Sequence, residues 1–128
     1  MALGVGAALY AAMIFLLSST SEVPGNAGGL FPGSDKLLHF VEFFILGGLL
    51  YLAFAYAGWQ PWDAPLAISL GVAYGFVDEF HQLFVTGRST DIFDALADAA
   101  GVLVAVGILM FLERRARRLA SSRLEDNA

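Results

Sequence analysis

The chain has 128 residues, enough for one domain, and 58% of them are hydrophobic whereas only 15% are charged. It contains no cysteine, which excludes disulfide bonds and thiolate metal sites. The formal net charge of −5 and the lack of a basic helix face argue against nucleic-acid binding.

Four apolar segments follow one another along the chain. A helix needs about 20 residues to cross a hydrocarbon core of about 30 Å, and about 17 suffice. The second and fourth segments meet this length, the first is short, and the third meets it only with its polar end. The segments cover residues 2–17, 37–56, 64–77 (extendable to 85) and 95–112. We predict an all-α bundle of four transmembrane helices over 1–113, with a basic and then polar tail over 114–128.

The first segment has a signal peptide as its alternative interpretation. Ser18, Ser19 and Ser21 offer small residues for cleavage, but no Lys or Arg precedes the apolar stretch. A retained membrane helix is therefore favoured. The following stretch, 18–34, is rich in Ser, Gly, Pro and Asn and is typical of a loop.

Orientation follows from the basic residues. Four arginines directly follow the fourth apolar segment, so that end is predicted to be cytoplasmic: Arg114, Arg115, Arg117 and Arg118. With four helices the amino terminus is also cytoplasmic, and the loops 18–36 and 85–93 face outward. Tyr56, Trp59 and Trp62 then suit the inner interface as an aromatic anchor.

The second helix opens with polar residues. Ser34 or Asp35 is predicted as its N-cap. Asp35, His39 and Glu42 are spaced i, i+4 and i+7 and share one face, and Lys36 lies one turn from His39. Below Glu42 the helix is apolar, with 47–48 (Gly-Gly) as the expected point of close contact.

The third helix combines a small-residue face with a polar end. Gly71 and Gly75 are spaced so that a neighbouring helix can approach closely. Asp78 and Gln82 are spaced i, i+4, and Glu79 and Gln82 i, i+3. His81 is expected to point elsewhere, because it lies about 200° from Glu79 around the helix.

The fourth helix repeats the acidic pattern. Ser89, Thr90 and Asp91 are alternative N-caps, and Asp91, Asp94 and Asp98 fall on one face. Gly101 extends this face as a notch. Three helices thus carry polar stripes that enter from the outer side to a similar depth. This predicts a polar cavity that opens outward and is closed below by apolar packing.

Capping explains only part of the polarity. It suffices for Asp35, Asp91 and Asp94, which are near helix starts. Glu42, Glu79 and Asp98 lie too deep and need partners in the interior. The predicted partners are Lys36, His39 and Arg88. No cofactor is predicted. Because the carboxylates outnumber these partners, binding of a divalent metal is an alternative, since carboxylate, His and Gln suit a hard or borderline cation. Arg88 could instead bind an anionic group or form a structural salt bridge.

The polar residues resemble those of the VanZ-like family of small bacterial membrane proteins over roughly 35–107. Their order and spacing carry the resemblance: Asp35-Lys36-x-x-His39-Phe40-x-Glu42 with Leu46-Gly47, Glu79-x-x-Gln82-x-Phe84, Gly87-Arg88, and Asp91, Asp94, Gly101 and Gly107. Phe43, Thr86 and Asp98 depart from the residues frequent in that family, which are Tyr, Pro and Asn. The resemblance implies a multi-pass protein of the bacterial cytoplasmic membrane, associated through its namesake with reduced susceptibility to teicoplanin.

Three functions are compatible with these residues. The leading one is a module that binds an amphipathic envelope ligand, such as a lipid headgroup, a cell-wall precursor or a lipoglycopeptide. A membrane-embedded enzyme is the first alternative, with His39, Glu42 and Glu79 as catalytic candidates and with a metal where one binds. A proton-linked transporter is the second. The predicted ligand-binding residues are Lys36, His39, Glu42, Glu79, Gln82, Arg88, Asp91, Asp94 and Asp98.

Overall fold

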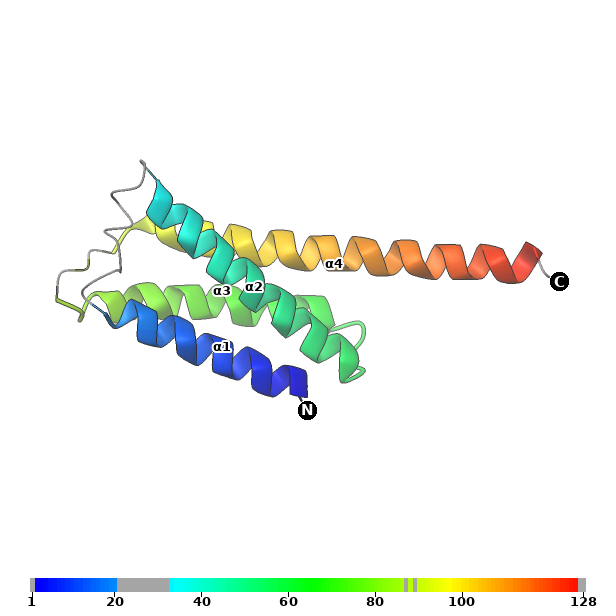
Figure 1. Cartoon of the computed structure of the whole chain (residues 1–128), viewed down its shortest axis with the longest axis horizontal. Coiled ribbons are helices and arrows are strands. Elements are labelled where there is room, and N and C mark those ends of the chain that lie inside the picture. Colours follow the sequence, from blue (N-terminus) through cyan, green and yellow to red (C-terminus); the bar gives the residue numbers. More distant parts are fainter. Residues whose placement is uncertain (1, 21–32, 87, 89, 127–128) are drawn as a thin grey trace.

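The chain forms four helices (Figure 1). The structure is a computed structural model that describes residues 2–20, 33–86, 88 and 90–126, so most of the predicted 18–34 loop lies outside the described residues. The prediction of an all-α fold is confirmed, and no strand occurs in the part of the chain described. The helices are α1 (Ala2–Ser18), α2 (Ser34–Tyr56), α3 (Asp63–Gln82) and α4 (Ile92–Asp126).

The helices run up and down beside one another (Figure 1). α2 and α4 begin at the same end of the bundle at which α1 and α3 finish, and both chain termini lie toward the opposite end. α2 packs against each of the other three helices. This topology brings the polar starts of α2 and α4 to the polar end of α3, although Lys36 and Asp94, for example, are 58 residues apart in sequence.

Glycines set the close packing of α4 against α2 and α3. A Cβ atom on Gly47 would lie 2.8 Å from Val102 Cα, and one on Gly71 would lie 2.9 Å from Val102 Cγ2. One on Gly75 would lie 3.1 Å from Asp98 Cβ. The close contacts predicted at these glycines are therefore confirmed. Val102 of α4 is fully buried where it meets α2 and α3.

The core beneath the polar residues is apolar. Ile14, Phe43 and Val102 are all 0% exposed, and Leu46 and Val106 pack with them in one cluster. α1 joins this core through Ile14 and accepts a 2.7 Å hydrogen bond from Tyr74 at the carbonyl of Ala11. The predicted apolar floor below the polar stripes is thus present.

Two of the described helices are long and apolar enough to cross a membrane. They are α2 and the 33 residues Ile92–Leu124 of α4, and only a third of the residues in each apolar stretch are buried inside the protein. α2 extends over about 34 Å at 1.5 Å per residue, which matches a bilayer core. α1 has 17 residues, and α3 carries Asp63, Asp78 and Glu79 among its 20.

The start of α2 differs from the sequence prediction. Gly33, in the left-handed conformation with φ of 86°, is the N-cap of α2, and no side chain caps that helix. The prediction of Ser34 or Asp35 as N-cap is therefore wrong, because the helix already includes Ser34. The tail predicted after residue 113 continues as helix to Asp126 and projects beyond the bundle (Figure 1).

A second polar contact fastens α2 to α4 at the opposite end of the bundle. The hydroxyl of Tyr51 donates a 2.5 Å hydrogen bond to Glu113, which also accepts from Gln60 and Arg117. A cavity of about 240 Å³ lies beside these residues. Both carboxylate oxygens of Glu113 accept hydrogen bonds from these neighbours, and the bond from Tyr51 joins α2 to α4.

Candidate functional site

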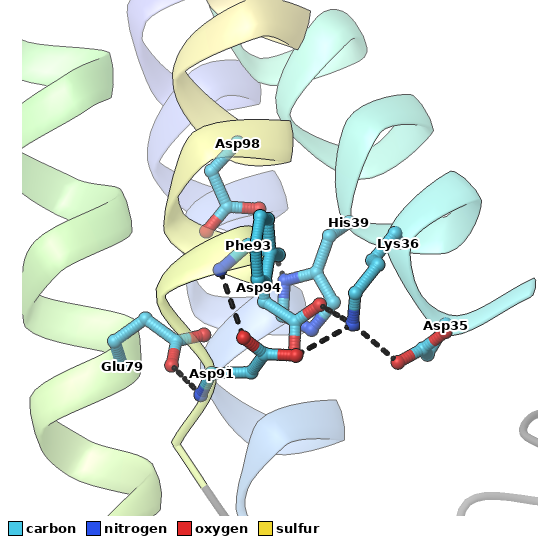
Figure 2. Close-up of polar contacts among 8 residues, drawn as sticks. All are labelled: Asp35, Lys36, His39, Glu79, Asp91, Phe93, Asp94 and Asp98. Atoms are coloured by element: carbon cyan, nitrogen blue, oxygen red, sulfur yellow. Dashed lines mark hydrogen bonds and ion pairs between the residues drawn. The ribbon is translucent and has the colours of Figure 1, made fainter. Parts of the chain in front are cut away.

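Lys36 forms ion pairs with three of the polar residues where α2 and α4 begin (Figure 2). Its Nζ atom lies 2.9 Å from Asp35, 2.8 Å from Asp91 and 3.0 Å from Asp94. A lysine ammonium has three N–H donors, so these three carboxylates satisfy all of them. We call the following residues the polar cluster: Asp35, Lys36, His39, Glu79, Asp91, Asp94 and Asp98.

His39 and Asp98 form the deeper pair of the cluster. His39 Nδ1 lies 3.0 Å from Asp98 Oδ1, and the two residues are 9% and 0% exposed. Each lies about one helical turn further into the bundle than Lys36 or Asp94. The predicted partnership of a deep acid with His39 is therefore present for Asp98.

Glu79 joins α3 to the start of α4. Its Oε2 atom accepts a 3.2 Å hydrogen bond from the backbone N–H of Asp91. Asp91 Oδ1 in turn accepts from the N–H of Phe93 at 2.9 Å, so Asp91, one of the three predicted alternatives, caps α4. The hydrogen bonds from Lys36 and from the Phe93 amide hold the pKa of the Asp91 carboxyl below its usual range.

Two other predicted residues flank the cluster. Gln82 Nε2 donates a 3.0 Å hydrogen bond to Asp78 Oδ2, as their spacing predicts, and both residues are 2% exposed. Glu42 is half-buried within electrostatic reach of His39, Asp78 and Asp98. It forms no hydrogen bond or ion pair with the residues that the structure describes. It lies near the cluster without being fixed to it.

The structure places Arg88 and His81 at the end of α1. Arg88 donates from Nη2 to the carbonyl of Leu17 and from Nε to that of Thr20, both at 3.3 Å. His81 Nε2 lies 2.9 Å from Ser19 Oγ, and its ring packs on Phe15. Arg88 thus adds hydrogen bonds to carbonyls at and just beyond the end of α1, where the carbonyl of Leu17 also accepts from Thr20. His81 points away from the cluster as expected.

Several buried oxygens around the cluster have no hydrogen-bond partner within the described ranges. Three are carboxylate oxygens: Asp78 Oδ1, Glu79 Oε1 and Asp98 Oδ2. The fourth is the hydroxyl of Ser34. Buried polar atoms without partners are rare in proteins, and each needs an explanation. Sequence spacing gives no signal for them, because it places side chains on a face without showing which atom stays unpaired.

The arrangement has two chemical capacities. His39, Glu79 and Asp94 come from three helices, and each offers a ligand atom within 4.8 Å of the other two, a separation that a metal ion could bridge. His39, oriented by Asp98, also has the composition of an acid–base pair. Neither capacity uses Arg88 in the position described here.

Comparison with known proteins agrees with the resemblance seen in the sequence. A family model described as VanZ/LLP1 matches residues 12–113, which include the polar cluster, all of α2 and α3, and parts of α1 and α4. An uncharacterized protein of Schizosaccharomyces pombe is 33% identical over 94 residues, or 73% of this chain. The chain covers 56% of that relative's length. No solved structure matches the chain. The chain belongs to the VanZ/LLP1 family.

Proposed function

We propose that the chain is a multi-pass membrane protein whose polar cluster binds the headgroup of an amphipathic envelope ligand. Large apolar side chains face outward on every helix, as Leu9, Leu38, Phe76 and Leu103 illustrate at 67%, 46%, 59% and 51% exposure. Apolar surface of this extent is rare on soluble monomers and suits lipid. All four helices then lie in the bilayer, including α1 and α3, which by length and composition alone are not candidate membrane spans.

The buried, unpaired carboxylate oxygens carry this proposal. Asp78 Oδ1, Glu79 Oε1 and Asp98 Oδ2 are all hydrogen-bond acceptors. Lys36 is already shared by three carboxylates, and Arg88 donates to the carbonyl of Leu17 in α1. The ligand that fits therefore supplies donors, such as hydroxyl, amide or ammonium groups. Lipid headgroups, cell-wall precursors and lipoglycopeptides all present such groups.

The orientation of the bundle supports a ligand on the outer side. The arginines that follow residue 113 lie at the end opposite the cluster and favour the cytoplasm. The cluster then faces outward in a bacterial cytoplasmic membrane. Teicoplanin acts there and carries a lipid tail, so the family's association with glycopeptide resistance agrees with this location.

A labelling experiment tests the orientation. The chain has no cysteine, so single cysteines can be added without background. We expect a membrane-impermeant maleimide to label Thr86→Cys in intact cells and to label Ala57→Cys only after lysis. Both positions are exposed, Ala57 just after α2 and Thr86 after the end of α3, at opposite ends of the bundle. Labelling of Ala57→Cys alone in intact cells would show the reverse orientation.

A lipid comparison tests the headgroup chemistry. Phosphatidylethanolamine and phosphatidylcholine have the same net charge, but only ethanolamine carries N–H donors. We expect native mass spectrometry to retain phosphatidylethanolamine several-fold better, because unpaired acceptors favour a donor.

The preference should disappear in Glu79→Gln, whose amide brings its own donor into the site. Asp63→Asn is the matched control: Asp63 is a buried acid at the other end of α3 and should keep the preference. Equal retention of both lipids by the wild-type protein would contradict the proposed headgroup chemistry.

An enzyme acting on such a lipid is the second candidate, favoured by the buried His39–Asp98 pair. Asp98 would orient the imidazole, and His39 would transfer protons at the bound headgroup. Incubation with phosphatidylethanolamine vesicles and measurement of released ethanolamine separates catalysis from binding. The apolar residues below the pair, Phe43 and Val102, favour both candidates over transport through a monomer.

A further inference from the structure

We propose that His39, Glu79 and Asp94 form a binding site for a divalent cation. The three residues come from α2, α3 and α4, and their ligand atoms lie within 4.8 Å of one another. All three side chains are buried, with exposed fractions of 9%, 8% and 7%. A cation at this point would fasten the three helices together where the polar cluster meets the apolar core.

The unpaired oxygen of Glu79 is the independent observation that points to a ligand. Glu79 Oε2 is fixed by the backbone N–H of Asp91, whereas Oε1 is buried and without a partner among the described residues. Figure 2 shows the Glu79 carboxylate directed toward Asp94 and His39. A metal ion would supply the partner that this oxygen lacks, in a place where a bare carboxylate is costly.

The surroundings of His39 fit a metal ligand. Its Nδ1 atom lies 3.0 Å from the buried carboxylate of Asp98, and in the tautomer that donates from Nδ1 to Asp98 the lone pair is on Nε2 and could bind the metal. Histidines that bind metals usually pair their second ring nitrogen with a carboxylate or carbonyl, which fixes the ring and strengthens the ligand. Asp98 would act as this positioning residue without touching the metal.

The ligand set selects the kind of cation. One imidazole nitrogen and two carboxylate oxygens suit a borderline ion such as Zn²⁺ or Mn²⁺, whereas Ca²⁺ prefers oxygen ligands alone. Metal–ligand distances of about 2.1 Å place tetrahedral ligands about 3.4 Å apart, so ligand atoms that lie up to 4.8 Å apart would move together by about 1 Å around the ion. Asp94 Oδ1 is held by Lys36, and its second oxygen would face the ion.

The site goes beyond the proposed headgroup function, and binding of the metal does not depend on it. A metal held here could also coordinate a hydroxyl or phosphate oxygen of a bound headgroup, and that role alone rests on the proposed function. Experiments with a metal and no added lipid ligand therefore test the site separately.

Titration calorimetry of the full chain in detergent, stripped of metals with EDTA, tests the proposal with Zn²⁺ and Mn²⁺ alone. We expect saturable binding of one ion per chain, and at least tenfold weaker binding for Glu79→Gln. Asp63→Asn, which removes a buried acid far from the site, should bind as the wild-type protein does. Thermal unfolding of each variant without metal checks that the fold is retained.

A second measurement uses the wild-type protein, so its result does not depend on whether a variant folds. The ¹⁵N chemical shift of His39 Nε2 should move strongly on Zn²⁺ addition, whereas that of His81 should not. Absence of saturable binding, equal losses in both variants, or an unmoved His39 signal would overturn the metal site. A preference for phosphatidylethanolamine that persists in EDTA would leave the headgroup proposal standing.

Discussion

Gly101→Ala is expected to destabilise the bundle by about 3 kcal/mol or more, the largest effect of adding one methyl group to this chain. Its Cβ atom would overlap the carbonyl oxygen of Phe40 and stand 2.8 Å from the amide nitrogen of Phe44. Both are backbone atoms of α2 and cannot rotate away. The helices α2 and α4 would therefore have to separate at their closest point.

Gly107→Ala is the matched control, because it lies on the same helix with nothing within 4 Å of the added atom. Alanine there should stabilise the helix by about 0.5–1 kcal/mol, since glycine loses more backbone entropy on folding. Reversible unfolding in mixed micelles measures both variants. Similar stabilities for the two would show that α2 and α4 are not in close contact at Gly101.

Separation of α2 from α4 should also disrupt the contacts of the polar cluster. Gly101 lies less than one turn from Asp98, whose partner His39 is on α2. We therefore expect Gly101→Ala to lose the lipid preference and the metal binding together with stability, whereas Gly107→Ala keeps both.

The second large effect concerns the buried pair of His39 and Asp98. Replacing either residue by alanine should cost about 3–5 kcal/mol, because the remaining polar group is left buried without its partner. The double variant His39→Ala/Asp98→Ala should lose less than the sum of the single variants. The expected coupling energy is about 1–3 kcal/mol.

A second double-mutant cycle provides the comparison. Glu113 and Arg117 are bonded across one exposed turn of α4, and their coupling should be close to the error of the measurement. Additive effects of His39→Ala and Asp98→Ala would show that the two residues stabilise the bundle independently. The hydrogen bond would then have no role in joining α2 to α4.

Helical periodicity predicted the fold because the chain is locally regular. The four apolar segments became α1 to α4, and the glycines at 47, 71, 75 and 101 lie where α4 packs closely, as their spacing indicated. The ends of helices were less predictable. Gly33 occupies the N-cap position of α2 in a left-handed conformation, and it has no side chain that could accept a capping hydrogen bond, so rules for side-chain capping do not predict it. The arginine-rich tail became helix because its residues are good helix formers.

The same periodicity predicted most of the candidate site. Asp91, Asp94 and Asp98 share the face that meets Lys36 and His39, as expected from their spacing. The contact of Arg88 with the end of α1 was not predictable, because it joins a turn to a helix about 70 residues earlier. The unpaired oxygens and the convergence of His39, Glu79 and Asp94 depend on side-chain positions in three helices, which spacing along one helix does not give.

Contact between the polar cluster and a headgroup is tested most directly by NMR of the chain in nanodiscs containing phosphatidylethanolamine. We predict intermolecular NOEs between the ethanolamine methylene protons and the side-chain protons of Glu79. The same lipids should give NOEs from their acyl chains to outward residues such as Phe76. Acyl-chain NOEs along the helices with no headgroup signal at Glu79 would contradict the account.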